Sequence, residues 1–340
     1  MNYLFNSATK ILAFLLLILL IIQACKKNDV PKIDTLSTGW KIIYPRDGSY
    51  YWMDIKFNDQ STGYLITPNN LFKSVDGGNH WDSVPAGHRM SYPNLNLIPR
   101  EPTQYWSLFL SNKKIFITTY QNHQKATPYL LVINDDQILD SIKFSDQISS
   151  MSFINQDTGY LASRTGFYLS VNGGEKWDLV KSLFLDTLNL PTFSATKFLS
   201  SSLGWVGMND LLFTIANNNV IQTTKIPDSK MDWYSISAHS DLVIFMTGSN
   251  GLFRSKDGGK SVTKIELPFA TKGYGLINFS DENNGFFSSE NKIYKTIDGG
   301  ISWTSEVELK TGNYITGIDF KNPNLGWACC SNGQVLLLKR

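Results

Sequence analysis

A short motif recurs four times in this chain with the same internal spacing. Each copy has serine or threonine, any residue, aspartate or asparagine, and then two glycines. The copies begin at Ser74, Ser170, Ser255 and Thr296. An aspartate followed by glycine is a strong hairpin signal, because glycine adopts positive φ at little steric cost. The motif therefore predicts one tight β-turn in each copy.

Two further markers precede the motif. A glycine followed by an aromatic residue, such as Gly63-Tyr64, lies thirteen residues before the aspartate or asparagine. A phenylalanine lies six residues before that glycine, and we call it the repeat phenylalanine; the five copies are Phe57, Phe153, Phe198, Phe279 and Phe320. Four short antiparallel strands fit between these markers. Units of four strands that recur every 40 residues or so indicate a β-propeller.

The spacing of the units predicts the number of blades. The turn markers Asp76, Asn172, Asn217, Asp257 and Asp298 are separated by 96, 45, 40 and 41 residues. The gap of 96 residues has room for one additional blade, with strands expected at 105–110, 114–120, 129–133 and 138–144. A last blade begins at 315–320, and its fourth strand is expected from residues 39–45, because the sequence around Trp40 resembles that at Trp81 and Trp303.

These observations predict an all-β fold in one domain, residues 38–340. It is a seven-bladed propeller of four-stranded antiparallel blades, whose last blade is closed by an N-terminal strand. Closure of this kind removes the open sheet edge that would otherwise invite aggregation. Six or eight blades are the alternatives, because residues 93–147 are poorly marked.

The N-terminus predicts export and lipidation. Lys10 precedes twelve apolar residues, too few to span a bilayer but typical of a secretory signal. The following Gln23-Ala24-Cys25 resembles a bacterial lipobox. The resemblance implies that residues 1–24 are a lipoprotein signal peptide, that Cys25 carries palmitate-type acyl chains, and that residues 25–37 are a tether. An ordinary signal peptide with a chance cysteine is the alternative.

This resemblance also implies a location. The propeller would lie outside the cytoplasm in a bacterial cell envelope, anchored to a membrane, and to the outer membrane where the cell has one. Periplasmic and surface-facing orientations both remain open. We expect a monomer.

Charge and composition exclude several classes of partner and cofactor. Lys and Arg number 31 against 29 Asp and Glu, with no basic stripe, so nucleic acid is not an expected partner. The four histidines show no ligand spacing, and neither a metal nor a cofactor is expected. Cys329 and Cys330 are expected in one strand, facing opposite ways as small apolar fillers, with a strained vicinal disulfide as the alternative.

The repeated turns resemble the Asp-boxes, or BNR repeats, of sialidases, sortilin-type receptors, xyloglucan-cleaving glycosidases and the photosystem II stability/assembly factor family. The glycine–aromatic marker and the blade length are most similar to the last of these. The resemblance implies a structural role for the box residues, which are Asp76, Asn172, Asp257, Asp298, Trp81, Trp177 and Trp303. Asn172 keeps a hydrogen-bond acceptor but carries no charge, which favours turn formation over metal binding.

Aromatic residues recur five or six residues before the repeat phenylalanine, where the innermost strand of a blade begins. Innermost strands line the central channel, so these side chains are expected to surround one mouth and offer faces to a ligand. Packing between blades is the alternative. The candidates are Tyr51, Trp52, Trp106, Trp233, Tyr274 and Tyr314, with Trp52 and Trp233 as the best of them.

We therefore predict a lipid-anchored, non-catalytic propeller that binds a protein or glycan partner at the channel mouth, as an assembly or stability factor. No photosynthetic role follows from the resemblance. The alternative is a glycoside hydrolase or sialidase-like enzyme. The Arg-Ile-Pro stretch of sialidases is absent; the nearest residues, Ile98-Pro99-Arg100, have a different order. Two carboxyl groups facing each other across the mouth would favour hydrolysis, and an uncharged aromatic mouth would favour binding.

Overall fold

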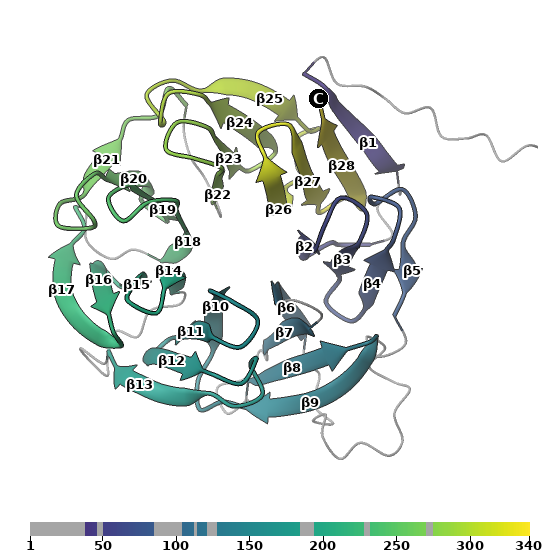
Figure 1. Cartoon of the computed structure of the whole chain (residues 1–340). Coiled ribbons are helices and arrows are strands. Elements are labelled where there is room, and N and C mark those ends of the chain that lie inside the picture. Colours follow the sequence, from purple (N-terminus) through teal and green to yellow (C-terminus); the bar gives the residue numbers. More distant parts are fainter. Residues whose placement is uncertain are drawn as a thin grey trace, which may run out of the picture. The chain divides into compact units, whose positions relative to one another are not determined.

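The computed structural model describes residues 38–45, 50–84, 104–111, 114–120, 128–183, 194–227, 232–269 and 275–340. They belong to one compact unit, Thr35–Arg340. Within these residues, 28 strands form seven four-stranded antiparallel sheets around a common centre (Figure 1). The prediction of an all-β, seven-bladed propeller is confirmed.

Each blade is a meander that runs from the centre to the outside (Figure 1). Blade 1 contains β2 (Asp54–Phe57), β3 (Gly63–Ile66), β4 (Leu71–Ser74) and β5 (Asp82–Ser83). Blade 2 contains β6 (Gln104–Ser111), β7 (Lys114–Tyr120), β8 (Tyr129–Asn134) and β9 (Gln137–Lys143). Blade 3 contains β10 (Ile148–Phe153), β11 (Gly159–Ser163), β12 (Gly166–Ser170) and β13 (Asp178–Ser182).

The remaining blades follow the same order. Blade 4 contains β14 (Ala195–Ser200), β15 (Leu203–Met208), β16 (Leu211–Ala216) and β17 (Asn219–Lys225). Blade 5 contains β18 (Trp233–Ala238), β19 (Ile244–Gly248), β20 (Gly251–Ser255) and β21 (Thr263–Ile265). Blade 6 contains β22 (Leu276–Phe279), β23 (Gly285–Ser289), β24 (Lys292–Thr296) and β25 (Thr304–Glu308). Blade 7 contains β26 (Ile315–Asn322), β27 (Leu325–Cys330), β28 (Gln334–Lys339) and β1 (Trp40–Pro45).

Blade 7 is closed by β1, as predicted. β1 pairs with β28, and Trp40 lies opposite Leu338. The Glu306 carboxylate of blade 6 accepts a hydrogen bond from Trp40 Nε1 at 3.2 Å and forms an ion pair with Arg340. Arg340 Nη2 also donates to the carbonyl of Thr38 at 2.6 Å. One nearly buried carboxylate therefore joins Trp40 of the N-terminal strand β1 to Arg340 at the end of blade 7.

Blade 2 lacks the sequence markers but has the same topology. Its strands lie within a residue or so of the predicted ranges. The turn between β8 and β9 is made by Asp135 and Asp136, both with positive φ (48° and 61°). In blade 4, Asn217 and Asn218 form the equivalent turn with φ of 48° and 64°. Aspartate and asparagine tolerate this conformation better than most residues, and the two-residue turn replaces the glycine turn of other blades.

The repeat phenylalanine explains the spacing of the sequence markers. Phe57 lies so close to Gly63 that a Cβ on that glycine would be 2.5 Å from the phenyl ring. The same ring stacks on Trp327 of the preceding blade, with centroids 3.8 Å apart. Corresponding stacks, at 3.6 to 3.9 Å, join Phe198 to Tyr160, Phe279 to Phe245 and Phe320 to Phe286. The glycine makes room for the phenylalanine. In blades 3, 6 and 7 the aromatic residue after this glycine receives the phenylalanine of the next blade, whereas in blade 5 that residue is Phe245, which follows Ile244.

The two adjacent cysteines are buried in β27 and form no disulfide. Cys329 packs against Trp52 and Trp327, whereas Cys330 packs on the other face, with Trp40. Burial raises the pKa of Cys329 to about 12 and raises that of Cys330 well above its usual value. Both side chains therefore remain neutral thiols and act as part of the core.

The described residues contain no helix long and apolar enough for a membrane span.

Candidate functional site

The Asp-box turns use their polar atoms locally. Ser74 Oγ accepts the amide hydrogen of Gly78 at 2.8 Å and donates to Asp76 Oδ1 at 2.9 Å. Asp76 Oδ1 also accepts the amide hydrogen of His80 at 3.0 Å. Gly77 and Gly78 have φ of 77° and 94°, which a residue with a Cβ rarely adopts. The same contacts recur at Ser170, Ser255 and Thr296.

The acidic oxygens of these turns are occupied even where they are exposed. Hydrogen bonds led by the hydroxyl of Ser261 lower the pKa of Asp257 to about 2, and those led by Ser302 lower the pKa of Asp298 to about 2. At the equivalent position, the Asn172 amide oxygen accepts from Lys176 N–H at 3.0 Å. Among the described residues, no group of three or more His, Cys, Asp or Glu could hold a metal ion.

The boxes also connect neighbouring blades. Trp327 Nε1 of blade 7 donates to the Gly77 carbonyl of blade 1 at 2.9 Å, and Trp205 Nε1 of blade 4 donates to the Gly258 carbonyl of blade 5 at 3.1 Å. The three box tryptophans each pack edge-on against the repeat phenylalanine of their own blade. They are Trp81, Trp177 and Trp303, with centroid separations of 5.8, 5.9 and 6.3 Å.

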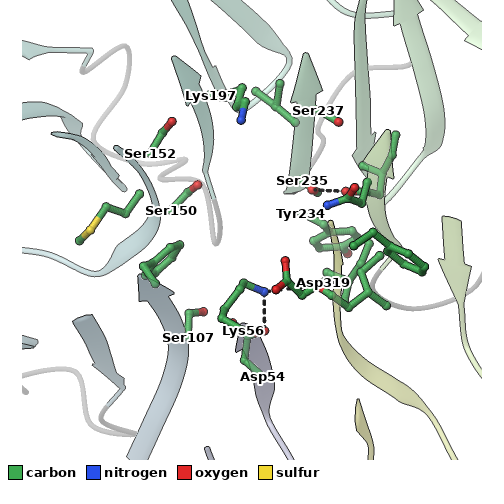
Figure 2. Close-up of a pocket in the computed structure, with 18 of the residues that line it drawn as sticks. Asp54, Lys56, Ser107, Ser150, Ser152, Lys197, Tyr234, Ser235, Ser237 and Asp319 are labelled. Atoms are coloured by element: carbon green, nitrogen blue, oxygen red, sulfur yellow. Dashed lines mark hydrogen bonds and ion pairs between the residues drawn. The ribbon is translucent and has the colours of Figure 1, made fainter. Parts of the chain in front are cut away.

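A cavity of about 870 Å³ lies at the centre of the propeller, and all seven innermost strands contribute to its wall. Hydroxyl and charged side chains dominate the part shown in Figure 2. They include Ser107, Ser150, Ser152, Ser235, Ser237, Lys197 and the group of Asp54, Lys56 and Asp319. Apolar residues such as Met53, Phe109 and Ile236 also line the cavity, so its wall is mixed in character and differs from an uncharged aromatic mouth.

The rim aromatics lie in two different environments. Tyr51 and Tyr314 are each 49% exposed and line the cavity, and Trp106 is half-buried in its wall. Trp52 and Trp233 are 0% and 1% exposed. Trp52 does not line the cavity and takes the packing alternative, whereas Trp233 borders the cavity with almost no exposed surface.

Both buried tryptophans have a packing role. Trp52 stacks on Tyr50 with centroids 5.3 Å apart. Trp233 Nε1 donates to the Asn209 carbonyl at 2.6 Å. The remaining rim candidate, Tyr274, lies outside the described residues.

In blade 5, a β-bulge accounts for the burial of Trp233. Counting back from the repeat phenylalanine by simple alternation, the fifth preceding residue should face the channel, as the first and third do. In blades 2, 3, 5 and 7 the register shifts between the fifth and third residues, for example between Trp233 and Ser235. An extra residue turns the following side chains to the other face. Trp233 is consequently almost fully buried at the edge of the cavity, and Tyr234, which the sequence did not suggest, lines the cavity beside it.

Two of the acidic residues that line the cavity, Asp54 and Asp319, are held by contacts among blades 7, 1 and 2, whereas the third, Glu290, belongs to blade 6. Asp54 accepts from Lys56 Nζ at 2.8 Å and from the Leu108 amide of blade 2 at 3.0 Å. Asp319 accepts from the Phe57 amide of blade 1 at 2.8 Å and pairs with Lys321 at 3.0 Å. Burial alone would lower the pKa of Lys56, but the nearby Asp54 and Asp319 carboxylates outweigh it and raise that pKa.

Serines perform the same task in other blades. Ser152 Oγ accepts the Phe198 amide of blade 4 at 3.1 Å, and Ser237 Oγ accepts the Phe279 amide of blade 6 at 3.0 Å. These serines and Asp319 all occupy the equivalent channel-facing position, which directly precedes the repeat phenylalanine or its equivalent, Ala238. A polar acceptor at this position satisfies the backbone of the next innermost strand. The recurring polar residue before phenylalanine was the sequence signal for it.

Known proteins resemble this chain in sequence and in fold. No protein-family model matches the chain. It is 23% identical over 322 residues to the photosystem II assembly lipoprotein Ycf48 of Synechococcus sp. (strain CC9902), covering 90% of this chain and 89% of that protein. The resemblance to the photosystem II assembly factor family is confirmed.

Solved structures share the fold. YCF48 bound to a D1 peptide superposes with a TM-score of 0.64 at 14% identity, covering 91% of this chain and 98% of that one. YCF48 from Cyanidioschyzon merolae gives 0.62 at 16%, covering 88% and 99%. An inactive virginiamycin B lyase from Staphylococcus aureus, with quinupristin, gives 0.66 at 12%, covering 88% and 99%. Because binding proteins and a lyase share this architecture, the fold alone does not decide the function.

The turn role of Asp76 can be tested by two substitutions. Asp76→Asn is expected to change the free energy of unfolding by less than about 0.5 kcal/mol, because the amide oxygen still accepts hydrogen bonds. Asp76→Ala removes the acceptor for Ser74 and His80 and is expected to cost about 1 to 2 kcal/mol. Urea denaturation measures both, with Asn172→Asp as the matched control. An asparagine variant as unstable as the alanine variant would contradict the turn role.

The two environments of the rim aromatics predict a large loss of stability for a buried residue and little change for an exposed one. Trp52→Ala leaves a void in a packed cluster and is expected to reduce the free energy of unfolding by about 3 to 5 kcal/mol. Tyr314→Ala removes a half-exposed ring and is expected to change it by less than about 0.5 kcal/mol. Chemical denaturation of both variants measures this contrast. Equal losses for the two would show that Tyr314 also packs in the core.

Proposed function

We propose that this chain is a lipid-anchored, non-catalytic propeller that binds a segment of a partner protein at the channel mouth, as an assembly or stability factor. The observation that carries the proposal is the composition of the channel wall. Its wall combines hydroxyl groups and lysines with the aromatic rings of Tyr51, Trp106, Tyr234 and Tyr314, while the carboxylates of Asp54 and Asp319 are tied to backbone amides.

The chemistry of the wall supports a peptide as the ligand. Serine hydroxyls can pair with backbone amides and carbonyls, and aromatic faces provide contact area with little loss of side-chain entropy. Acid catalysis of glycoside cleavage needs a carboxyl group that is free to give its proton. Asp54 and Asp319 instead accept hydrogen bonds from the next blade, so Glu290, which also lines the cavity, has no second free carboxyl group in the described wall, and this supports binding over hydrolysis. The similar Ycf48 is named as an assembly lipoprotein, and one solved YCF48 holds a peptide.

The anchor is the second part of the proposal. Residues 1–24 would be removed as a signal peptide, Cys25 would be acylated, and residues 25–37 would tether the propeller, residues 38–340, to a membrane of the bacterial envelope on the non-cytoplasmic side. One acyl chain binds a membrane only marginally, but two or more anchor it stably. These N-terminal residues lie outside the described part of the chain, so their sequence supports the proposal, together with the lipoprotein name of the relative.

The anchor predicts that Cys25 is the one thiol needed for lipidation. Cys25→Ser is expected to abolish incorporation of labelled palmitate and to move the protein from the detergent phase to the aqueous phase on phase separation. Cys330→Ala removes a buried thiol and is the matched control, which should retain the label. Unchanged labelling of the Cys25→Ser protein would exclude lipidation at this residue.

The binding role can be tested by photo-crosslinking in cells. A benzophenone amino acid in place of Tyr314 at the mouth is expected to capture a protein segment, whereas the same group in place of Ile221, exposed on β17, is not. A synthetic peptide of the captured segment should then bind the detergent-solubilised chain, and more weakly to Tyr314→Ala. Adducts that form equally at both positions would contradict the proposal. So would turnover of glycans by the same preparation.

A further inference from the structure

Lys197 is the basic residue that blade 4 contributes to the channel. It lies on β14, directly before Phe198, and Figure 2 shows its ammonium group directed into the cavity. Ser152 of blade 3 and Ser237 of blade 5 occupy the equivalent position on either side of it. Asp54 and Lys56 lie across the cavity from it (Figure 2).

Lys197 does not accept a backbone hydrogen bond, unlike residues at the equivalent position of other blades. Ser152, Ser237 and Asp319 accept a backbone amide of the next blade at this position. An ammonium group has no lone pair and cannot accept. Lys197 also forms no hydrogen bond or ion pair with any described residue, and burial lowers its pKa. The other lysine at this position, Lys56, is by contrast neutralised by Asp54.

The hydroxyl groups around Lys197 can act as hydrogen-bond donors. Ser152 Oγ accepts the Phe198 amide and Ser150 Oγ accepts the Thr196 amide, each at 3.1 Å. Ser237 Oγ accepts the Phe279 amide at 3.0 Å. A serine hydroxyl that accepts in this way still has its own proton to donate. No carboxylate of the described residues pairs with Lys197, since Asp54 and Asp319 are held by other lysines and by backbone amides.

We propose that Lys197, flanked by the hydroxyls of Ser152 and Ser237, is a binding site for a carboxylate group inside the channel. One ammonium matches the single charge of a carboxylate, and hydroxyl donors on both sides fit its two oxygens. A small free carboxylate and a carboxylate on a peptide share this chemistry. That the occupant belongs to a protein segment rests on the proposed function.

The site can be tested through the reactivity of Lys197 in the detergent-solubilised full chain. Its acylation by an amine-reactive ester is followed by peptide mass spectrometry. Acetate, N-acetyl-alanyl-alanine and N-acetyl-glutamate amide are expected to slow acylation of Lys197 several-fold, because an ion-paired ammonium is a poor nucleophile. The amidated dipeptide N-acetyl-alanyl-alanine amide, which has no carboxylate, is not expected to protect it. Lys256, exposed on its turn, serves as the internal control.

Two variants complete the test by calorimetric titration with the same compounds. Lys197→Met is expected to weaken carboxylate binding by about tenfold or more, as for loss of a charge-assisted hydrogen bond. Lys256→Met, which removes the same charge from the surface, is expected to leave it unchanged. Thermal unfolding verifies that both variants fold.

Several outcomes would overturn the site. They are equal protection by the amidated dipeptide, tighter binding of inorganic phosphate than of carboxylate, or unchanged binding to Lys197→Met. The two carboxylate peptides distinguish a chain terminus from an acidic side chain. Protection of Lys197 by acetate without any protein captured at Tyr314 would leave the site standing and remove the proposed function.

Discussion

The stack of each repeat phenylalanine on the aromatic residue of the preceding blade is the contact on which the propeller depends. Such a pair contributes about 0.5 to 1.5 kcal/mol beyond its buried area, and four close stacks hold neighbouring blades together. It also fixes the glycine, because the phenylalanine occupies the space of a Cβ. Trp327 adds a second tie, since its Nε1 hydrogen-bonds to the turn of the next blade. The recurring sequence markers are thus the parts of one joint between blades.

The same joint restricts what the channel can offer to a ligand. Innermost strands expose backbone amides that need acceptors, and the residue before the repeat phenylalanine supplies them from the preceding blade. Asp319 and Ser152 are therefore committed to the ring even though they line a cavity. A lysine at this position cannot accept a hydrogen bond from the next blade, so its side chain has another role. Lys56 is used to neutralise Asp54, and Lys197 is left with its charge directed at the cavity.

The sequence could predict the contacts between blades but not the register of the innermost strands near their first residues. Phe57, Gly63 and the Asp76 turn have fixed spacing, so blade number and closure followed from counting. The 96-residue gap disclosed blade 2, although Asp135 and Asp136 replace its glycine turn. The bulge next to Trp233 leaves no comparable signal, because an inserted residue changes the facing of side chains without changing their type. The sequence therefore located the aromatic pairs, but it did not indicate that Tyr234 lines the channel beside Trp233.

In this fold, function depends on which hydrogen-bond donors and acceptors of the channel remain free once neighbouring blades have bonded to each other. A lyase and an assembly factor share the architecture, so the count of blades carries no chemistry. In this chain Asp54 and Asp319 use their carboxylates on amides and lysines, which leaves Glu290 as the acid of the described channel wall without such a partner. What remains near Lys197 is a set of hydroxyl donors with no carboxylate paired to the lysine. Donors directed into a cavity favour capture of an anionic group, because water competes less for them there than at the surface.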